Sequence, residues 1–133
     1  MTLGLLCLNS NLSMMAKPMM TLYGIKNCDS VKKARHWLQE QGLEYHFFDL
    51  RADGIDSQTL QTWIDQVGWE PVLNKRGTTW RKLDSDQQQN VNQSTIVDLL
   101  QANPTLIKRP VLNVDGIIII GFSIESYHQI FNS

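Results

Sequence analysis

One cysteine stands at a position where a thiol can become reactive. Cys28 follows a short apolar run that Gly24 interrupts, and a helical pattern begins directly after it, at Asp29. The N–H groups of a first helical turn have no partners inside the helix, and the helix dipole adds partial positive charge there. Both effects favour a thiolate, so we predict that Cys28 is a nucleophile. The alternative is a small, buried and inert cysteine.

Basic residues occur both near Cys28 and far from it along the chain. The near ones favour a thiolate through their charge: Lys26, Lys32 and Lys33. The distant ones reach the cysteine only if the fold brings them there: Arg76, Arg81, Lys108 and Arg109. Considered singly, each distant arginine fits a solvated surface position better than a catalytic one. The three histidines show no metal-ligand spacing, so we predict no metal site.

The composition suits one compact domain with a hydrophobic core. The chain has 133 residues, of which 42% are apolar, and a net charge of −1. This charge gives no reason to expect nucleic acid or an anionic membrane as a partner, and no apolar run approaches the roughly 20 residues of a membrane span. Two cysteines, Cys7 and Cys28, fit a reducing compartment, so we predict a cytoplasmic protein.

The chain divides into a leader and a single domain. Residues 1–18 carry a short apolar segment without a basic start, which predicts a disordered or artefactual leader rather than a signal peptide. Cys7 lies in this leader and is expected to be incidental. We assign residues 19–133 to one domain, with a helical insert at residues 51–105.

Both ends of this domain have strand character. A strand up to Gly24, a helix over 29–41 and a strand over 43–50 predict a right-handed unit with two parallel strands. Asp115-Gly116 between two apolar runs predicts a late hairpin with a type I′ turn. Ser123 is expected to cap a last helix that ends at Phe131.

The middle of the chain shows helical periodicity. Asp56 can cap a helix that ends at Gly68, and Ser94 can cap another that Asn103-Pro104 closes. Between them we expect a basic loop over 74–83 and a short helix in the polar stretch that follows. The order predicts an α/β thioredoxin-like fold, with one four-stranded mixed sheet and an all-helical insertion.

Three separated segments resemble the YffB subgroup of the ArsC/Spx family: GIKNCDSVKKARHWL, LNKRGTTWRKL and IKRP. That family comprises glutaredoxin-coupled arsenate reductases, the Spx regulators and small proteins of the YffB type. The resemblance covers about residues 20–131. It implies a thioredoxin-like fold with a helical insert and a nucleophile at Cys28. It also implies substrate-facing arginines at Arg76 and Arg109, and a cis-proline at Pro110 beside the thiol.

The chain departs from the family patterns at two places. Where the arsenate reductases carry arginines, this chain has Lys32 and the segment Gly121-Phe122-Ser123, which argues against arsenate as substrate because lysine lacks the planar fork of a guanidinium. Where the Spx regulators carry a second cysteine, this chain has Val31, which excludes an internal disulfide at this site.

We therefore predict a glutathione-dependent thiol-disulfide reductase with no bound cofactor. A mixed disulfide on Cys28 has no neighbouring thiol to resolve it, so an external thiol such as glutathione must do so. The substrate-binding residues are expected to be Lys26, Asn27, Lys32, Arg76, Arg109 and Pro110. The alternatives are arsenate reduction coupled to glutaredoxin, and a non-catalytic Spx-like protein that docks on another protein. We expect a monomer.

Overall fold

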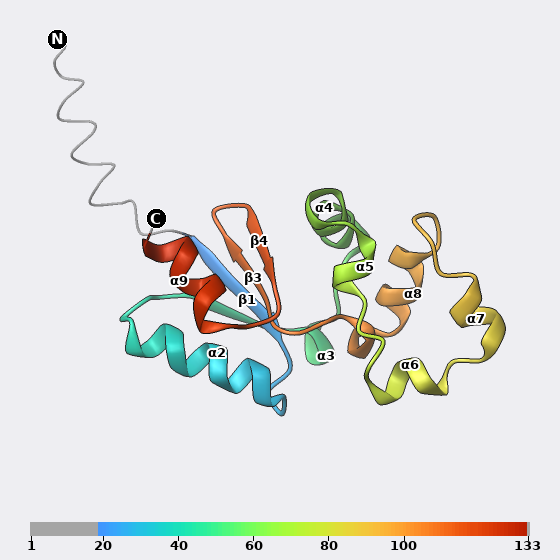
Figure 1. Cartoon of the computed structure of the whole chain (residues 1–133), viewed down its shortest axis with the longest axis horizontal. Coiled ribbons are helices and arrows are strands. Elements are labelled where there is room, and N and C mark those ends of the chain that lie inside the picture. The colour runs from blue at the N-terminus through green and yellow to red at the C-terminus, as the bar shows by residue number, and fades with distance from the viewer. Residues whose placement is uncertain (1–18, 133) are drawn as a thin grey trace, which may run out of the picture.

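The structure, a computed structural model, describes residues 19–132. The predicted leader at 1–18, including Cys7, lies outside the described residues. No helix in the described part of the chain is long and apolar enough to cross a bilayer. Figure 1 shows a sheet with two helices beside it and a second group of helices at the other side of the molecule.

The sheet is mixed and has the strand order β2-β1-β3-β4. Its strands are β1 (Met20–Gly24), β2 (His46–Asp49), β3 (Val111–Val114) and β4 (Ile117–Ile120). β1 pairs with β2 in parallel, whereas the β1–β3 and β3–β4 pairs are antiparallel. The thioredoxin-like fold with a four-stranded mixed sheet, predicted from the element order, is confirmed. The second strand is shorter than predicted, because residues 43–45 precede the pairing with β1.

Two helices cover one face of this sheet: α2 (Asp29–Glu40) and α9 (Ile124–Asn132). α2 buries an apolar stripe at helical spacing: Val31, Ala34, Trp37 and Leu38. It ends as predicted, because Gly42 adopts a positive φ of 70° that a glycine tolerates without strain. α9 starts at the predicted cap, where the Ser123 hydroxyl accepts a hydrogen bond from the Ser126 N–H.

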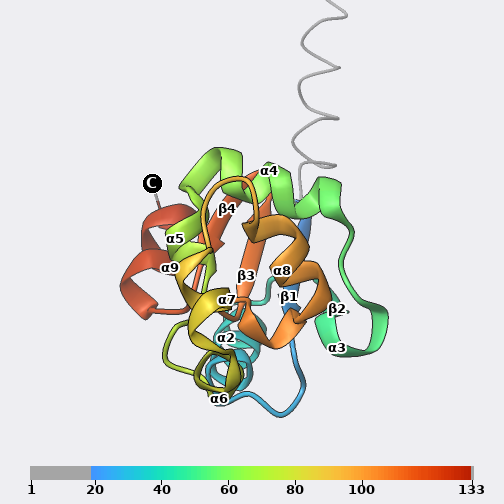
Figure 2. The same cartoon turned by 90° about the vertical axis from the view of Figure 1, so that its right-hand side faces the viewer.

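The segment between β2 and β3 is helical, and Figure 2 shows it end-on. It contains α3 (Leu50–Asp53), α4 (Ser57–Val67), α5 (Trp69–Val72), α6 (Thr78–Lys82), α7 (Ser85–Gln89), α8 (Ile96–Ala102) and the 3₁₀ turn η1 (Pro104–Leu106). α4 begins at the predicted cap, since the Asp56 carboxylate accepts from the Thr59 N–H at 2.7 Å. α7 confirms the short helix predicted after the basic loop.

Three details of this segment differ from the prediction. The strand predicted over 43–50 ends at Asp49, because Leu50 begins α3, which Asp49 caps by accepting from two backbone N–H groups. The expected loop over 74–83 contains α6. Ser94 caps nothing, because Asn92 holds residues 92–95 in a turn by accepting from the Ser94 and Thr95 N–H groups; α8 therefore begins after Thr95.

The side chains of the sheet alternate between two hydrophobic cores. Leu22 and Leu112 face the core formed with α2 and α9, whereas Val111 and Ile118 face the core formed with the helical segment. We call these the α2/α9 core and the insert core. Because successive side chains of a strand point to opposite faces, one short sheet serves both.

The late hairpin closes as the sequence predicts. Asp115 and Gly116 both have positive φ values, 51° and 92°, as a type I′ turn requires. The side chain of Gln66 on α4 then reaches the outer edge of β4. Its amide donates to the Gly116 carbonyl at 2.5 Å and accepts from the Ile118 N–H at 3.2 Å.

Candidate functional site

Cys28 is the N-cap residue of α2 and has an extended backbone conformation, with φ −112° and ψ 125°. A turn precedes Cys28, in which the Cys28 N–H donates to the Ile25 carbonyl at 3.3 Å. Its carbonyl accepts the first helical bond, from the Lys32 N–H at 3.0 Å. The side chain is half-buried and makes no capping hydrogen bond. The sulfur therefore stands at the positive end of the helix dipole and is not committed to a cap.

A close contact between β1 and α2 holds this cysteine in place. A Cβ atom built on Gly24 would lie 2.7 Å and 2.9 Å from the two γ-carbons of Val31. Only glycine lets the strand and the first turn of the helix approach this far. Val31 itself is fully buried. Val31, three residues after Cys28, carries no thiol and instead packs α2 onto β1.

Pro110 lies at the same end of the sheet as Cys28. The register pairs Val111 with Tyr23, so Pro110 stands beside the end of β1 from which the Cys28 turn departs. The Arg109–Pro110 peptide bond is cis, as the resemblance implied. The Pro110 carbonyl accepts from the Gly121 N–H at 2.8 Å, which ties the end of β4 to this site. Burial, with the nearby Asp56 carboxylate adding to it, raises the pKa of Tyr23, so this residue brings no charge to the end of β1.

Arg109 is half-buried and turned toward the chain that precedes it. Its Nη1 donates to the carbonyls of Thr105 and Ile107, at 2.9 Å and 3.2 Å. Its Nε is buried and has no hydrogen-bond partner among the described residues. The guanidinium therefore stabilises the η1 turn through one of its nitrogens, and among the described residues no hydrogen bond joins it to Arg76.

Basic residues of two separate segments, around Arg76 and around Lys108, lie next to each other because these segments pair. Leu73 and Ile107 form an isolated antiparallel bridge. The Asn74 N–H donates to the Leu106 carbonyl, and the Lys108 N–H donates to the Val72 carbonyl, both at 2.8 Å. Lys75 and Arg76 are thereby brought next to the segment that leads into Pro110.

A hollow of about 290 Å³ lies where these segments meet. We call it the basic hollow, and its lining consists of Leu73, Asn74, Lys75, Arg76 and Lys108. It contains three cations and no carboxylate. Lys108 was not among the predicted site residues. Its place directly before Arg109-Pro110 could have suggested Lys108 as a site residue. The sequence could not show toward which segment the Lys108 side chain turns.

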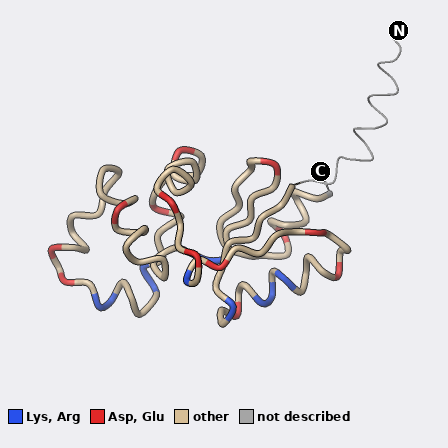
Figure 3. Tube along the Cα trace, turned by 180° about the vertical axis from the view of Figure 1, so that it is seen from behind, with Lys and Arg blue, Asp and Glu red and all other residues tan. Residues whose placement is uncertain are grey.

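The remaining predicted residues lie around Cys28. Lys26 and Asn27 are exposed in the turn before α2, and Lys32 is exposed on its first turn. Figure 3 shows basic residues along α2, in the turn before it and in α6, all toward the lower side of the molecule. The structure thus places Arg76 in the basic hollow and the lysines at the helix start, and the assignment of these groups to one site stays a prediction.

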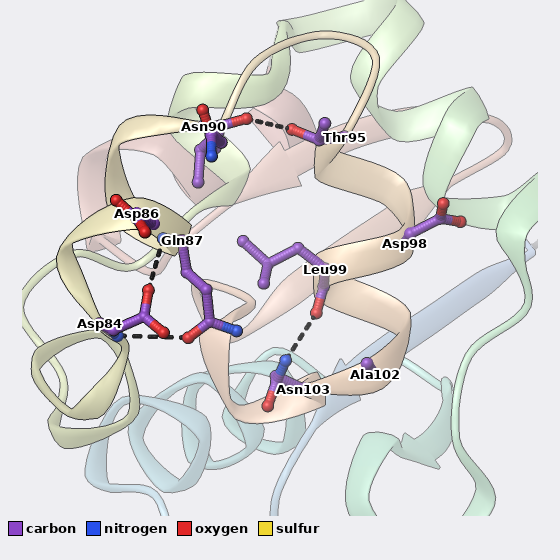
Figure 4. Close-up of a pocket in the computed structure, with 10 residues that line it drawn as sticks. Asp84, Asp86, Gln87, Asn90, Thr95, Asp98, Leu99, Ala102 and Asn103 are labelled. Carbon is purple, nitrogen blue, oxygen red and sulfur yellow. Dashed lines mark hydrogen bonds between the residues drawn. The ribbon is translucent and has the colours of Figure 1, made fainter.

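A larger hollow of about 460 Å³ lies between α7 and α8, and none of the residues predicted to do chemistry lines it. Figure 4 shows its polar rim, where Asp84 and Gln87 hydrogen-bond to each other across the first turn of α7. Its carboxylates are Asp84, Asp86 and Asp98. No group of His, Cys, Asp or Glu between residues 19 and 132 is arranged to hold a metal ion.

Comparison with known proteins identifies the protein family. A family model described as the ArsC family matches residues 23–130. The chain belongs to the ArsC family. An uncharacterized protein of Haemophilus influenzae is 45% identical over 85% of this chain and 99% of that protein. The global transcriptional regulator Spx of Enterococcus faecalis is 28% identical over 79% of this chain and 80% of its own length.

Two solved structures share both sequence and fold with the chain. A YFFB protein is 44% identical, with a TM-score of 0.81 over 84% of this chain and 97% of that one. An arsenate reductase (ArsC) related protein from Brucella melitensis is 43% identical, with a TM-score of 0.68 over 86% and 96%. The chain is therefore similar to YffB-type proteins and to Spx, and thiol-reductase-like, arsenate-reductase-like and Spx-like roles are the functions that such relatives support.

Proposed function

We propose that this ArsC-family protein is a glutathione-dependent thiol-disulfide reductase. The observation that carries the proposal is the state of Cys28. Its side chain is half-buried at the start of α2, makes no capping bond and has no other cysteine beside it in the described part of the chain. A nucleophile with these properties accepts a disulfide-bonded partner and depends on an outside thiol for release.

The reaction proceeds by two thiol-disulfide exchanges. The Cys28 thiolate attacks the glutathione sulfur of a mixed disulfide; that S–S bond breaks, and the substrate thiolate leaves and takes a proton from water. A second glutathione thiolate then attacks the glutathione sulfur held on Cys28. Oxidised glutathione leaves, and the Cys28 thiolate is restored. The substrate sulfur is reduced to a thiol, the sulfur of the incoming glutathione is oxidised, and the number of disulfide bonds stays the same.

The surrounding residues bind the tripeptide. The N-terminus of α2 stabilises the thiolate form of Cys28. Lys26, Asn27 and Lys32 line the approach to the sulfur. Arg76 attracts a glutathione carboxylate, and Arg109, whose Nη1 is held by the carbonyls of the η1 region, adds its positive charge. Pro110 borders the sulfur at the sheet end. The protein acts as a cytoplasmic monomer without a bound cofactor, and glutaredoxin is a further candidate partner.

Intact mass spectrometry of the reduced full-length chain after incubation with oxidised glutathione tests this proposal. We expect one glutathionyl adduct at neutral pH in Cys7→Ser and none in the Cys7→Ser/Cys28→Ser double variant. The Cys7→Ser form should also reduce a small glutathione mixed disulfide with turnover. No adduct on Cys28 would overturn the proposal.

A second variant probes the need for an outside thiol. Val31→Cys places a thiol one helical turn after Cys28, at a residue that is fully buried against Gly24. In the Cys7→Ser background we expect the glutathionyl adduct to be replaced by an internal disulfide, because the new thiol resolves the intermediate first. An adduct as stable as that of the parent would mean that the Cys28 sulfur points away from position 31.

Arsenate reduction is the second candidate, favoured by the 43% identity to the arsenate reductase related protein from Brucella melitensis. It predicts arsenate-dependent turnover with glutathione and glutaredoxin that Cys28→Ser abolishes. Absence of such turnover, with both reductants present, would eliminate it.

An Spx-like docking role is the third candidate, favoured by the identity to the regulator of Enterococcus faecalis. It predicts a protein partner that binds the Cys28→Ser variant as well as the parent. The exposed helices of the insert would supply the surface, including the region of Trp69 and Trp80, which are only half-buried. Loss of binding in Cys28→Ser would contradict a role that is independent of the thiol.

A further inference from the structure

We propose that the basic hollow binds the carboxylates of glutathione and that Lys108 decides which anion enters it. This inference rests on the proposed function and extends it, because it assigns a ligand-binding and specificity role to a residue outside the predicted site. The argument begins with charge. Lys75, Arg76 and Lys108 line the hollow without a carboxylate, and no ion pair engages any of the three among residues 19–132. Of these three side chains, only that of Lys75 contacts a charged or aromatic group in the described part of the chain, the ring of Trp80, whose centroid lies 5.6 Å from its Nζ.

The side chain of Lys108 lies next to Gly121. Gly121, directly after β4, has a positive φ of 78°, and a Cβ atom built on it would lie 3.4 Å from the Cε of Lys108. The Lys108 side chain therefore runs alongside position 121, at an ordinary van der Waals distance from where a Cβ atom would lie. The Gly121 N–H is bonded to the Pro110 carbonyl at 2.8 Å, so this part of Lys108 lies next to the sheet end that also carries the Cys28 turn.

The size of the basic hollow favours an organic anion over a single oxyanion. Its volume of about 290 Å³ is close to the lower limit of roughly 300 Å³ for small-molecule pockets. The two ends of its cationic lining come from different segments, since Arg76 follows the Leu73 bridge and Lys108 follows Ile107. A ligand with two separated carboxylates can contact both ends at once. The compact ammonium of Lys108 suits one carboxylate oxygen, whereas a tetrahedral oxyanion is better held by converging guanidinium forks.

Binding of S-methylglutathione tests this inference without any reaction at sulfur. We use the full-length Cys7→Ser/Cys28→Ser chain and follow the titration by NMR and calorimetry. Lys108→Ala should weaken binding about tenfold, because it removes a charge-assisted contact. Lys82→Ala is the control: Lys82 is an exposed lysine on α6 outside the hollow, and its removal should change affinity less than twofold. Lys108→Arg should restore most of the affinity. Thermal unfolding verifies that each variant folds.

A pair of glycine variants tests the geometry while all charges stay in place. Gly121→Ala places a methyl group in van der Waals contact with the Cε of Lys108 and so limits where its ammonium can lie, and we therefore expect weaker binding. Gly116→Ala is the matched control, because Gly116 also has a positive φ, 92°, but a Cβ there would meet nothing within 4 Å. It should bear the same backbone strain and bind S-methylglutathione normally.

The outcomes separate this inference from the proposed reaction. If S-methylglutathione does not bind, or binds Lys108→Ala as tightly as the parent, the inference is wrong, even where Cys28 still forms its glutathionyl adduct. If inorganic phosphate displaces the probe at equal concentration, the hollow takes oxyanions and the assigned ligand class is wrong. If binding depends on Lys108 but no adduct forms on Cys28, the carboxylate site stands and the proposed reaction fails.

Discussion

The two faces of the sheet carry different parts of the candidate site. The α2/α9 core is rich in aromatic rings: Tyr127 meets Trp37 and Phe122 edge-on, with centroid distances of 5.6 Å and 4.8 Å. The insert core is mainly aliphatic and surrounds Trp63. The first core fixes the helix that presents Cys28, and the second fixes the segments that carry Arg76 and Lys108. Cys28 and the cations of the basic hollow are therefore positioned by separate packing.

The largest effects should come from a matched pair of leucines, one in each core. Leu38 on α2 and Leu100 on α8 are both fully buried. Truncation of either to alanine should lower the free energy of unfolding by about 2–5 kcal/mol. Below their melting temperatures the variants should differ: Leu38→Ala should change the alkylation rate of Cys28, and Leu100→Ala should weaken S-methylglutathione binding, because α8 packs on η1. Equal changes of both properties in both variants would show that the two faces act as one unit.

A smaller effect is expected where the sheet meets α2. Gly24→Ala should lower the free energy of unfolding by about 1–3 kcal/mol, because the new methyl group overlaps the side chain of Val31. It should also slow alkylation of Cys28 by displacing the first turn of α2. Urea unfolding and a thiol-alkylation assay measure the two effects. In a double-mutant cycle, Val31→Ala should recover part of the loss, and strict additivity would place the cause elsewhere.

The smallest effect concerns the hydroxyl of Tyr127, which is buried without a hydrogen-bond partner in the described part of the chain. Tyr127→Phe should raise the free energy of unfolding by about 1 kcal/mol, because it removes an unsatisfied polar group. Burial also raises the pKa of Tyr127. The unfolded state therefore loses this proton near pH 10, before the folded state does. The parent should lose stability as the pH rises above about 10, and the phenylalanine variant should lack this contribution.

Urea midpoints of the two proteins, measured at about pH 8 and about pH 10.5, test the Tyr127 prediction. The difference between them should grow with pH, in favour of the variant. A parent that is the more stable protein at both pH values would show that the hydroxyl is satisfied in solution.

Local signals made part of this structure predictable. Asp56, Gly42 and the Asp115-Gly116 pair each specify a boundary through a side-chain cap or a positive φ, and each stands where predicted. Cys28 belongs to the same class, because its place before α2 follows from neighbouring residues. Such features depend on interactions within a few positions of the chain.

Other features depend on distant partners, so the sequence could not define them. The Leu73–Ile107 bridge joins residues that are far apart in the chain, and it creates the basic hollow. By residue type Ser94 is as suitable an N-cap as Thr95. The Asn92 side chain accepts from the Ser94 N–H and holds a turn there, so α8 begins only after Thr95. Arg109 was expected to face the substrate, and its contacts with the carbonyls of η1 could be found only in the structure.

The two hydrogen bonds of Gln66 have a consequence for self-association. β4 is an edge strand, and a free edge offers its N–H and C=O groups to any other extended chain. The Gln66 amide occupies the Ile118 N–H and the Gly116 carbonyl at once. One side chain from α4 thus takes up two of the backbone groups near this edge that the strand of a second molecule would need for pairing.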